Sequence, residues 1–197
     1  MMIFDSQVSI KPHFYPYNWC VEYKDGTYLT EYDFENNRWN DFYLIQTKPI
    51  KRFGLFNQGR KFYYENDGSF WLNGQLIQIE YHVDDEIYEL TSSFDDKDCI
   101  QYKQSYMTPS GEGEQQVIVE STQFGYKTLI MKDDIQFHFQ SLVCVPTFNG
   151  TPYFEVRLTS NKELNGKLVF KNKGKIVEEI NTPLRKNYKW IGNWSIK

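Results

Sequence analysis

Alanine is absent from all 197 residues of the sequence. Alanine is the strongest helix former, whereas aromatic and β-branched residues favour strands. Aromatic residues make up 18% of the chain, as 15 Tyr, 15 Phe and 5 Trp. These proportions predict an all-β protein built from antiparallel hairpin or meander sheets. The length suits one large β domain or two small ones, and is sufficient to bury a core.

Long apolar runs are also missing, because no stretch approaches the roughly 18 apolar residues of a membrane-spanning helix. The first residues, MMIFDSQVSIKPHF, lack a basic segment followed by an apolar one. We therefore expect no membrane span and no signal peptide, and predict a cytoplasmic protein of a bacterium or an infected host cell. The net charge is −4 and the pI is near 5.5. This balance argues against partnership with long nucleic acid or an anionic membrane.

Cysteine is scarce and its spacing is uninformative. The chain has three cysteines, at Cys20, Cys99 and Cys144, and none belongs to a Cys-x-x-Cys pair. An odd number of distant cysteines predicts reduced thiols that are mostly buried, rather than a disulfide framework or a zinc site.

Catalytic signatures are absent as well. The sequence contains no G-x-G-x-x-G, no G-x-x-x-x-G-K-[ST] and no G-x-S-x-G. We predict no catalytic residue, no cofactor, no metal and no enzymatic activity. The alternative is a metal-dependent hydrolase that uses Glu80, His82 and Asp84, which share one face of a strand. Because such residues also form the ordinary wet face of an antiparallel sheet, a solvated surface is the preferred interpretation.

Turn signals recur at short intervals along the chain, and Asn-Gly and Asp-Gly supply the positive φ angles that tight hairpins need. The predicted turns are Asp25-Gly26, Asn57-Gln58-Gly59, Asn66-Asp67-Gly68, Asn73-Gly74, Asn149-Gly150, Asn165-Gly166 and Asn172-Lys173-Gly174. The polar, glycine-rich residues 108–116 predict a linker or long loop. We therefore divide the chain into an N-terminal antiparallel β domain over residues 1–107 and a C-terminal β-sandwich of immunoglobulin-like size over residues 117–197.

The stretch WCVEYKDGTYLTEY, from Trp19 to Tyr32, is typical of a hairpin. A two-residue Asp25-Gly26 loop would place Tyr23 opposite Tyr28, with both rings on the same face. Rings segregated in this way most often form core, with a ligand platform as the alternative. Apolar and polar residues also alternate in QLIQIEYHV, DIQFHFQ and FEVRL, which predicts half-buried strands.

One group of residues combines cations with aromatic rings. Arg52, Arg60 and Lys61 lie close in sequence to Tyr63 and Trp71. Arginine can bind a phosphate or carboxylate through two hydrogen bonds, and aromatic planes can stack on a base or sugar. These five are the predicted ligand-binding residues. The alternative is that the rings fill the core while the cations protect an edge strand.

The N-terminal part carries a resemblance to known proteins. The run Trp19-x-Val21-x-Tyr23-x-Asp25-Gly26-Thr27-x-Leu29, followed by IKRFGLF, resembles the start of small uncharacterised proteins of phages and prophages of low-GC Gram-positive bacteria. The excess of 17 Lys over 5 Arg agrees with an AT-rich genome. The resemblance implies a phage-linked setting and no activity.

Together these features predict a non-enzymatic, phage-encoded binding protein that antagonises a host defence pathway. Its partner would be a host protein or a small anionic nucleotide that it sequesters. The alternative is a virion or tail structural protein, or a glycan-binding protein. Homo-oligomer formation is left open.

Overall fold

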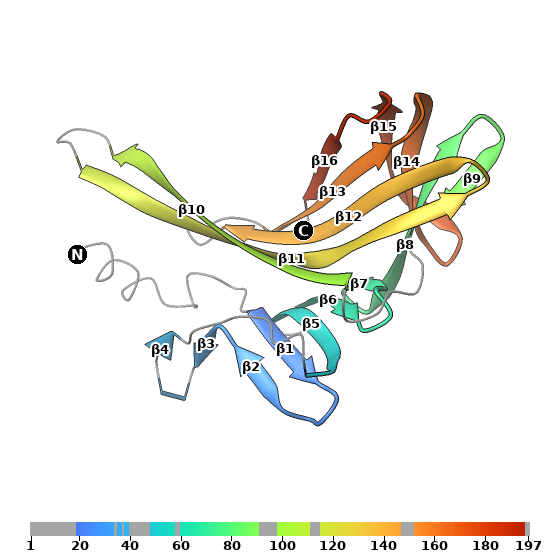
Figure 1. The fold of residues 1–197 in the computed structure, drawn as a ribbon. Coiled ribbons are helices and arrows are strands. Elements are labelled where there is room, and N and C mark those ends of the chain that lie inside the picture. Colours follow the sequence, from blue (N-terminus) through green and yellow to red (C-terminus); the bar gives the residue numbers. More distant parts are fainter. Residues whose placement is uncertain are drawn as a thin grey trace.

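The computed structural model describes residues 19–33, 35–36, 38–39, 48–57, 60–90, 98–110, 115–146 and 152–195, and their regular structure consists of antiparallel strands (Figure 1). The large sheet runs in the order β15 (Lys175–Leu184), β14 (Leu164–Asn172), β8 (Gln75–Val83), β7 (Phe70–Leu72), β6 (Arg60–Glu65), β5 (Ile50–Asn57), β1 (Trp19–Tyr23) and β2 (Tyr28–Thr30), with β9 (Glu86–Glu89) paired to β8. The small sheet runs in the order β10 (Cys99–Ser110), β11 (Gln115–Lys132), β12 (Ile135–Pro146), β13 (Tyr153–Ser160) and β16 (Trp190–Ser195). A separate pair joins β3 (Tyr32–Asp33) to β4 (Arg38–Trp39).

The all-β antiparallel fold class is thus confirmed, and within the described ranges no helix is long and apolar enough to cross a membrane. Each sheet takes strands from both sides of the predicted linker. β14 and β15 join the large sheet through β8, while β10 joins the small sheet through β11. The flanks of residues 108–116 are themselves paired strand, with Ser110 opposite Gln115. The two predicted segments are therefore not the two layers of the fold.

A layer of aromatic rings lies between the two sheets. The ring pairs that cross it include Trp19–Phe124 at 4.6 Å, Phe53–Tyr126 at 5.4 Å, Tyr64–Tyr126 at 5.4 Å, Phe70–Phe154 at 4.7 Å and Tyr81–Phe137 at 5.6 Å between centroids. Tilted and offset ring pairs at these separations add to the stabilisation that burial provides. The hydroxyl of Tyr126 also donates a hydrogen bond across the layer to the carbonyl of Glu65, at 2.9 Å. The rings therefore pack inward and join both sheets into one core.

The alternation read from the sequence is confirmed in the strands that form this core. In β8, the side chains of Ile77, Ile79, Tyr81 and Val83 are buried. Phe137 and Phe139 of β12 are buried in the same way, whereas His138 between them is exposed. Because successive side chains of a strand point to opposite faces, each strand presents a polar row to the outside.

The predicted register of the opening hairpin is wrong by one residue. Glu22 pairs with Tyr28 and Val21 with Leu29, while the N–H of Tyr23 donates to the carbonyl of Thr27 at 2.9 Å. The reversal therefore spans three residues, Lys24 to Gly26, instead of two. A shift of one residue moves a side chain to the other face. Tyr23 is consequently 2% exposed in the core, whereas Tyr28 is 63% exposed on the opposite side of the hairpin.

The turn predicted at Asn165-Gly166 is also wrong, because both residues lie inside β14. Gly166 is needed there for close packing: a Cβ atom would lie 2.4 Å from the carbonyl oxygen of His82 and 2.6 Å from the ring of Tyr81. Two reversals without glycine were missed. They occur at Asp84 and Asp133, whose φ angles are 52° and 57°. Aspartate tolerates this conformation better than most residues do.

The turns predicted at Gly26, Gly68, Gly74 and Gly174 are confirmed, since each of these glycines has a positive φ. Gly59 and Asn149-Gly150 lie outside the described residues. The three cysteines are buried and form no disulfide, as expected. Burial raises the pKa of Cys20 and of Cys144 to about 12, so these thiols stay protonated and unreactive near neutral pH.

The observed register makes a direct prediction about two tyrosines. Tyr23→Ala should lower the free energy of unfolding by about 3 kcal/mol, because it removes a buried ring from the core. Tyr28→Ala should change it by less than about 0.5 kcal/mol, because that ring is mostly solvated. Urea denaturation of both variants measures the difference. Equal destabilisation would restore the register predicted from the sequence.

A second prediction concerns Tyr81, whose hydroxyl joins three backbone groups. It lies 2.9 Å from the carbonyl of Thr182 and 3.2 Å from that of Leu164, and it accepts the N–H of Gly166 at 2.9 Å. Tyr81→Phe leaves these groups without their partner and should cost about 1–3 kcal/mol at pH 8. The exposed Tyr188→Phe is the matched control and should cost nothing measurable.

The same substitution should change the response to alkaline pH. Burial raises the pKa of Tyr81 to about 12, above the ordinary value of about 10. The stability that this proton provides is complete below about pH 10 and is lost as the pH rises through about 12. Chemical denaturation at a series of pH values should therefore show a shallower alkaline loss in Tyr81→Phe than in the wild type. Parallel curves would contradict this assignment.

Candidate functional site

Three of the five predicted ligand-binding residues lie together on the outer face of the large sheet. Arg52 pairs with Glu65, and Tyr63 pairs directly with Trp71. The rings of Tyr63 and Trp71 are parallel within 5°, with centroids 6.1 Å apart. Arg60 and Lys61 belong to the same strand as Tyr63, but their side chains lie outside the described part of the structure.

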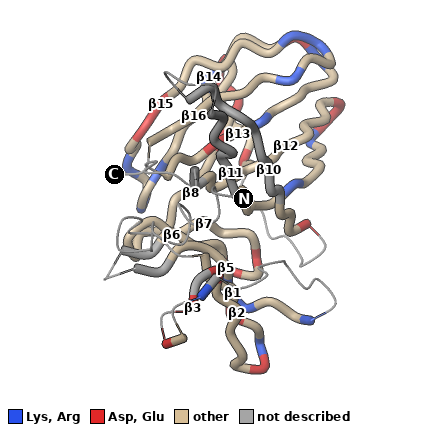
Figure 2. The backbone as a smooth tube through the Cα atoms, turned by 90° about the vertical axis from the view of Figure 1, so that its left-hand side faces the viewer, with Lys and Arg blue, Asp and Glu red and all other residues tan. Residues whose placement is uncertain are grey.

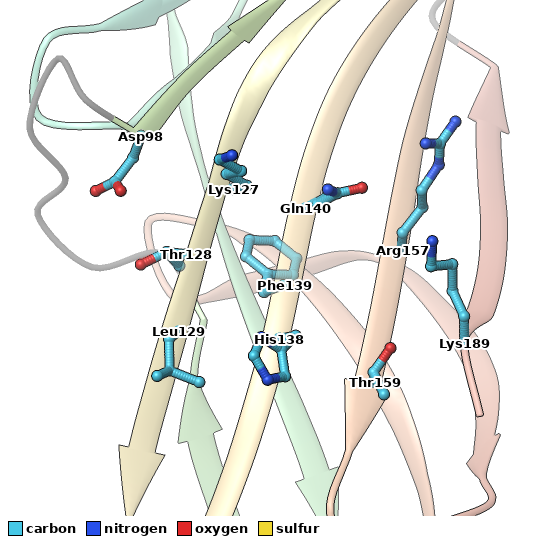
Figure 3. A pocket seen from close by; sticks show the side chains of 10 residues that line it. All are labelled: Asp98, Lys127, Thr128, Leu129, His138, Phe139, Gln140, Arg157, Thr159 and Lys189. Carbon is cyan, nitrogen blue, oxygen red and sulfur yellow. The ribbon is translucent and has the colours of Figure 1, made fainter. Parts of the chain in front are cut away.

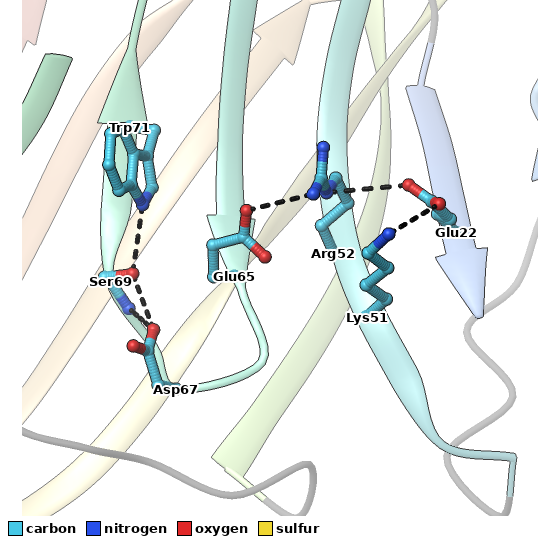
Figure 4. Close-up of polar contacts among 7 residues, drawn as sticks. All are labelled: Glu22, Lys51, Arg52, Glu65, Asp67, Ser69 and Trp71. Atoms are coloured by element: carbon cyan, nitrogen blue, oxygen red, sulfur yellow. Dashed lines mark hydrogen bonds and ion pairs between the residues drawn. The ribbon is translucent and has the colours of Figure 1, made fainter. Parts of the chain in front are cut away.

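The cations of this face are paired with acidic side chains. The guanidinium of Arg52 lies 3.5 Å from the carboxylate of Glu22 and 3.4 Å from that of Glu65 (Figure 4). It also lies over the ring of Tyr63, at 5.4 Å from the centroid. Lys51 approaches Glu22 at 3.4 Å. Burial raises the pKa of Glu65, and the charge of Arg52 opposes that shift. The charge of Arg52 is therefore balanced by two carboxylates, and ligand binding by the five residues stays a prediction.

Of Glu80, His82 and Asp84, the first two are in contact and Asp84 lies apart from them. The carboxylate of Glu80 lies 2.8 Å from the ammonium of Lys171 and 2.9 Å from Nε2 of His82. Asp84 is exposed in the turn between β8 and β9. Among the described residues, no three His, Cys, Asp or Glu side chains are grouped to hold a metal ion. A lysine that already pairs with Glu80 would compete with a cation, so the face fits the solvated interpretation better than the hydrolase alternative.

A pocket of about 320 Å³ lies on the outer face of the small sheet (Figure 3). We call it the sheet pocket, and its lining residues are Asp98, Lys127, Thr128, Leu129, His138, Phe139, Gln140, Arg157, Thr159 and Lys189. The strand register places six of these residues in two rows. Lys127, Gln140 and Arg157 face one another across β11, β12 and β13, and Leu129, His138 and Thr159 form the next row. The rows are one strand repeat apart, or about 6.6 Å.

The lining of the sheet pocket carries an excess of positive charge. Lys127 and Lys189 are exposed, and neither forms an ion pair with any residue that the structure describes. Figure 2 shows basic and acidic residues over both sheets. Arg185 and Lys186, between β15 and β16, are further exposed basic residues, in a chain whose net charge is −4. Asp98 is the carboxylate among the lining residues, so the pocket keeps a positive balance.

Arg157 is held in place at the edge of this row. Its Nε donates to the carboxylate of Glu155 at 2.7 Å, and its Nη2 donates to Oε1 of Gln123 at 3.4 Å. Glu155 and Gln123 are themselves 8% and 7% exposed. Buried partners of this kind restrict the rotamers of a long side chain, which lowers the entropy lost when a ligand binds.

Gln140 occupies the middle of the row, and the hydrogen-bonding capacity of its side chain is incompletely used. Its Oε1 atom is buried and has no hydrogen-bond partner among the described residues. A buried acceptor without a partner costs about 1–3 kcal/mol. Such atoms are uncommon in folded proteins and often mark a place where a ligand or water completes the hydrogen bonding.

Comparison of the sequence with protein family models, with curated proteins and with solved structures finds no match. The phage setting, the role in host defence and the virion or glycan-binding alternative therefore remain predictions from the sequence.

The residues of the sheet pocket were not predicted as a site. The alternation in DIQFHFQ and FEVRL did place His138, Gln140 and Arg157 on outer faces, and this much is confirmed. Their grouping depends on the register of three long strands and on Lys189, which precedes β16. The turn at Asp133-Asp134, had it been recognised, would have aligned Lys127 with Gln140.

Proposed function

We propose that this chain is a non-enzymatic binding protein that holds a small anionic molecule in the sheet pocket. The observation that carries the proposal is a pocket with two lysines, Lys127 and Lys189, that no described carboxylate neutralises. Isolated ammonium groups that share a concave surface raise the local potential and attract anions. The volume of about 320 Å³ is at the small end of the range for ligand pockets, which favours a small molecule over a peptide segment.

Arg157 adds a directional contact to these point charges. Because Glu155 and Gln123 bind its Nε and Nη2, the guanidinium keeps a fixed direction at the upper right of the pocket in Figure 3. Arginine donates in a planar fork that matches carboxylate and phosphate oxygens. The lysines would then supply attraction, and Arg157 would supply orientation.

The proposal predicts a loss of anion binding when the lysine charges are removed. Inorganic phosphate and pyrophosphate are titrated into the wild type and into Lys127→Gln/Lys189→Gln at low salt, with heat as the readout. A charged hydrogen bond contributes about 1.5–3 kcal/mol, so the double variant should bind pyrophosphate at least about tenfold more weakly. Affinity for the wild type should also fall as salt rises, because the charges are exposed.

The matched control is Lys24→Gln/Lys175→Gln, which removes the same charge from two exposed lysines of the large sheet. It should bind as the wild type does. Amide NMR shifts on adding pyrophosphate should be confined to β11, β12, β13 and the residues around Lys189. Equal affinity of pocket variant and control, or shifts centred on Arg52 and Tyr63, would contradict the proposal.

A further inference from the structure

The sheet pocket changes character from one row to the next. The first row, Lys127, Gln140 and Arg157, is cationic and hydrogen-bonding. The second row combines Leu129, which is 47% exposed, with the exposed ring of His138 and the hydroxyl of Thr159. Figure 3 shows the two rows side by side, with Leu129 and His138 on neighbouring strands and Gln140 above His138. An apolar side chain beside an exposed ring is a surface on which a planar group can stack.

The spacing of the rows limits what could occupy both. Residues two apart on a strand are separated by about 6.6 Å. A ligand that fills the pocket therefore needs an anionic group at one end, a planar apolar group at the other, and a short polar connection between them. Gln140 lies at the junction, and its buried Oε1 has no hydrogen-bond partner among the described residues. The terminal torsion of a glutamine is broad, so a modest rotation can turn this atom toward a ligand.

We infer that the sheet pocket takes a nucleoside phosphate. The phosphate binds between Lys127, Arg157 and Lys189, a ribose hydroxyl donates to Oε1 of Gln140, and the base lies over Leu129 and His138. A nucleoside phosphate has the three parts in this order, with the sugar hydroxyls between the charge and the ring. This assignment rests on the proposed function and specifies the class of anion. No covalent step is involved.

The test uses the full chain and compares three ligands that contain successively more of a nucleotide. Inorganic phosphate, ribose 5-phosphate and adenosine 5′-monophosphate are titrated by calorimetry under identical salt. Each added part should lower the dissociation constant. The base should lower it about tenfold, because a base stacks favourably on an aromatic ring. His138→Ala should lose the gain from the base while ribose 5-phosphate binds unchanged. Gln140→Leu should lose the gain from the ribose.

The outcomes separate the two claims. If phosphate binds and adenosine 5′-monophosphate binds no more tightly, the nucleoside assignment is overturned while the anion pocket stands. If none of the three probes binds, both fail. The exposed Tyr188→Ala is the control variant, and circular dichroism confirms that each variant keeps its strands. A loss of base affinity in Tyr188→Ala equal to that in His138→Ala would also overturn the assignment.

Discussion

The rest of the structure depends on one constraint: the two sheets must bury the same layer of aromatic rings. Trp19, Phe53 and Tyr64 of the large sheet pack on Phe124 and Tyr126 of the small one. Aromatic side chains bury about 150–250 Å² each, so a layer of this kind dominates the energy of folding. Because each strand can turn only alternate residues inward, the constraint also decides which side chains are left outside.

The two outer faces that result differ in their charge balance. On the large sheet, Arg52 lies between two carboxylates, and Lys171 and Lys167 each pair with a glutamate, whereas the exposed Lys24 and Lys175 form no ion pair with a described residue and line no described pocket. On the small sheet, Lys127 and Lys189 are left without a described carboxylate partner, around a pocket. Cations that already form ion pairs gain little binding free energy from an added anion, whereas cations without a carboxylate partner gain an ion pair. This difference favours the small sheet as the binding face.

Local sequence patterns predicted much of the fold but little of the site. Alternation identified β8, β12 and β13 and their inward residues because periodicity is a property of each strand alone. Alternation does not determine the pairing register between strands. The hairpin at Asp25-Gly26 is an example, because a loop of two residues and a loop of three residues can both contain this dipeptide. The turn predicted at Asn165-Gly166 was wrong for a related reason. Glycine is favourable both in a turn and where another group packs closely against the backbone, and here the ring of Tyr81 packs closely against Gly166. Predicting the sheet pocket would have required the correct register of three strands at once.

The same reasoning explains why three of the predicted binding residues lie together. Arg52, Tyr63 and Trp71 do lie together on one face, since neighbouring strands are joined by short turns. The acidic partners Glu22 and Glu65 come from the paired positions on either side of Arg52. Cross-strand pairing of opposite charges is an ordinary way to stabilise a sheet. Proximity was therefore predictable from the sequence, but the balance of charge was not.

The claim that a shared aromatic layer joins the sheets into one unit is tested most directly by amide hydrogen exchange under increasing denaturant. If the layer unites them, the slowest amides of β5 in the large sheet and of β11 in the small sheet should report the same opening free energy and the same denaturant dependence. If β11, β12 and β13 instead lose protection well before β5 and β6, the sheets unfold separately and the account is contradicted.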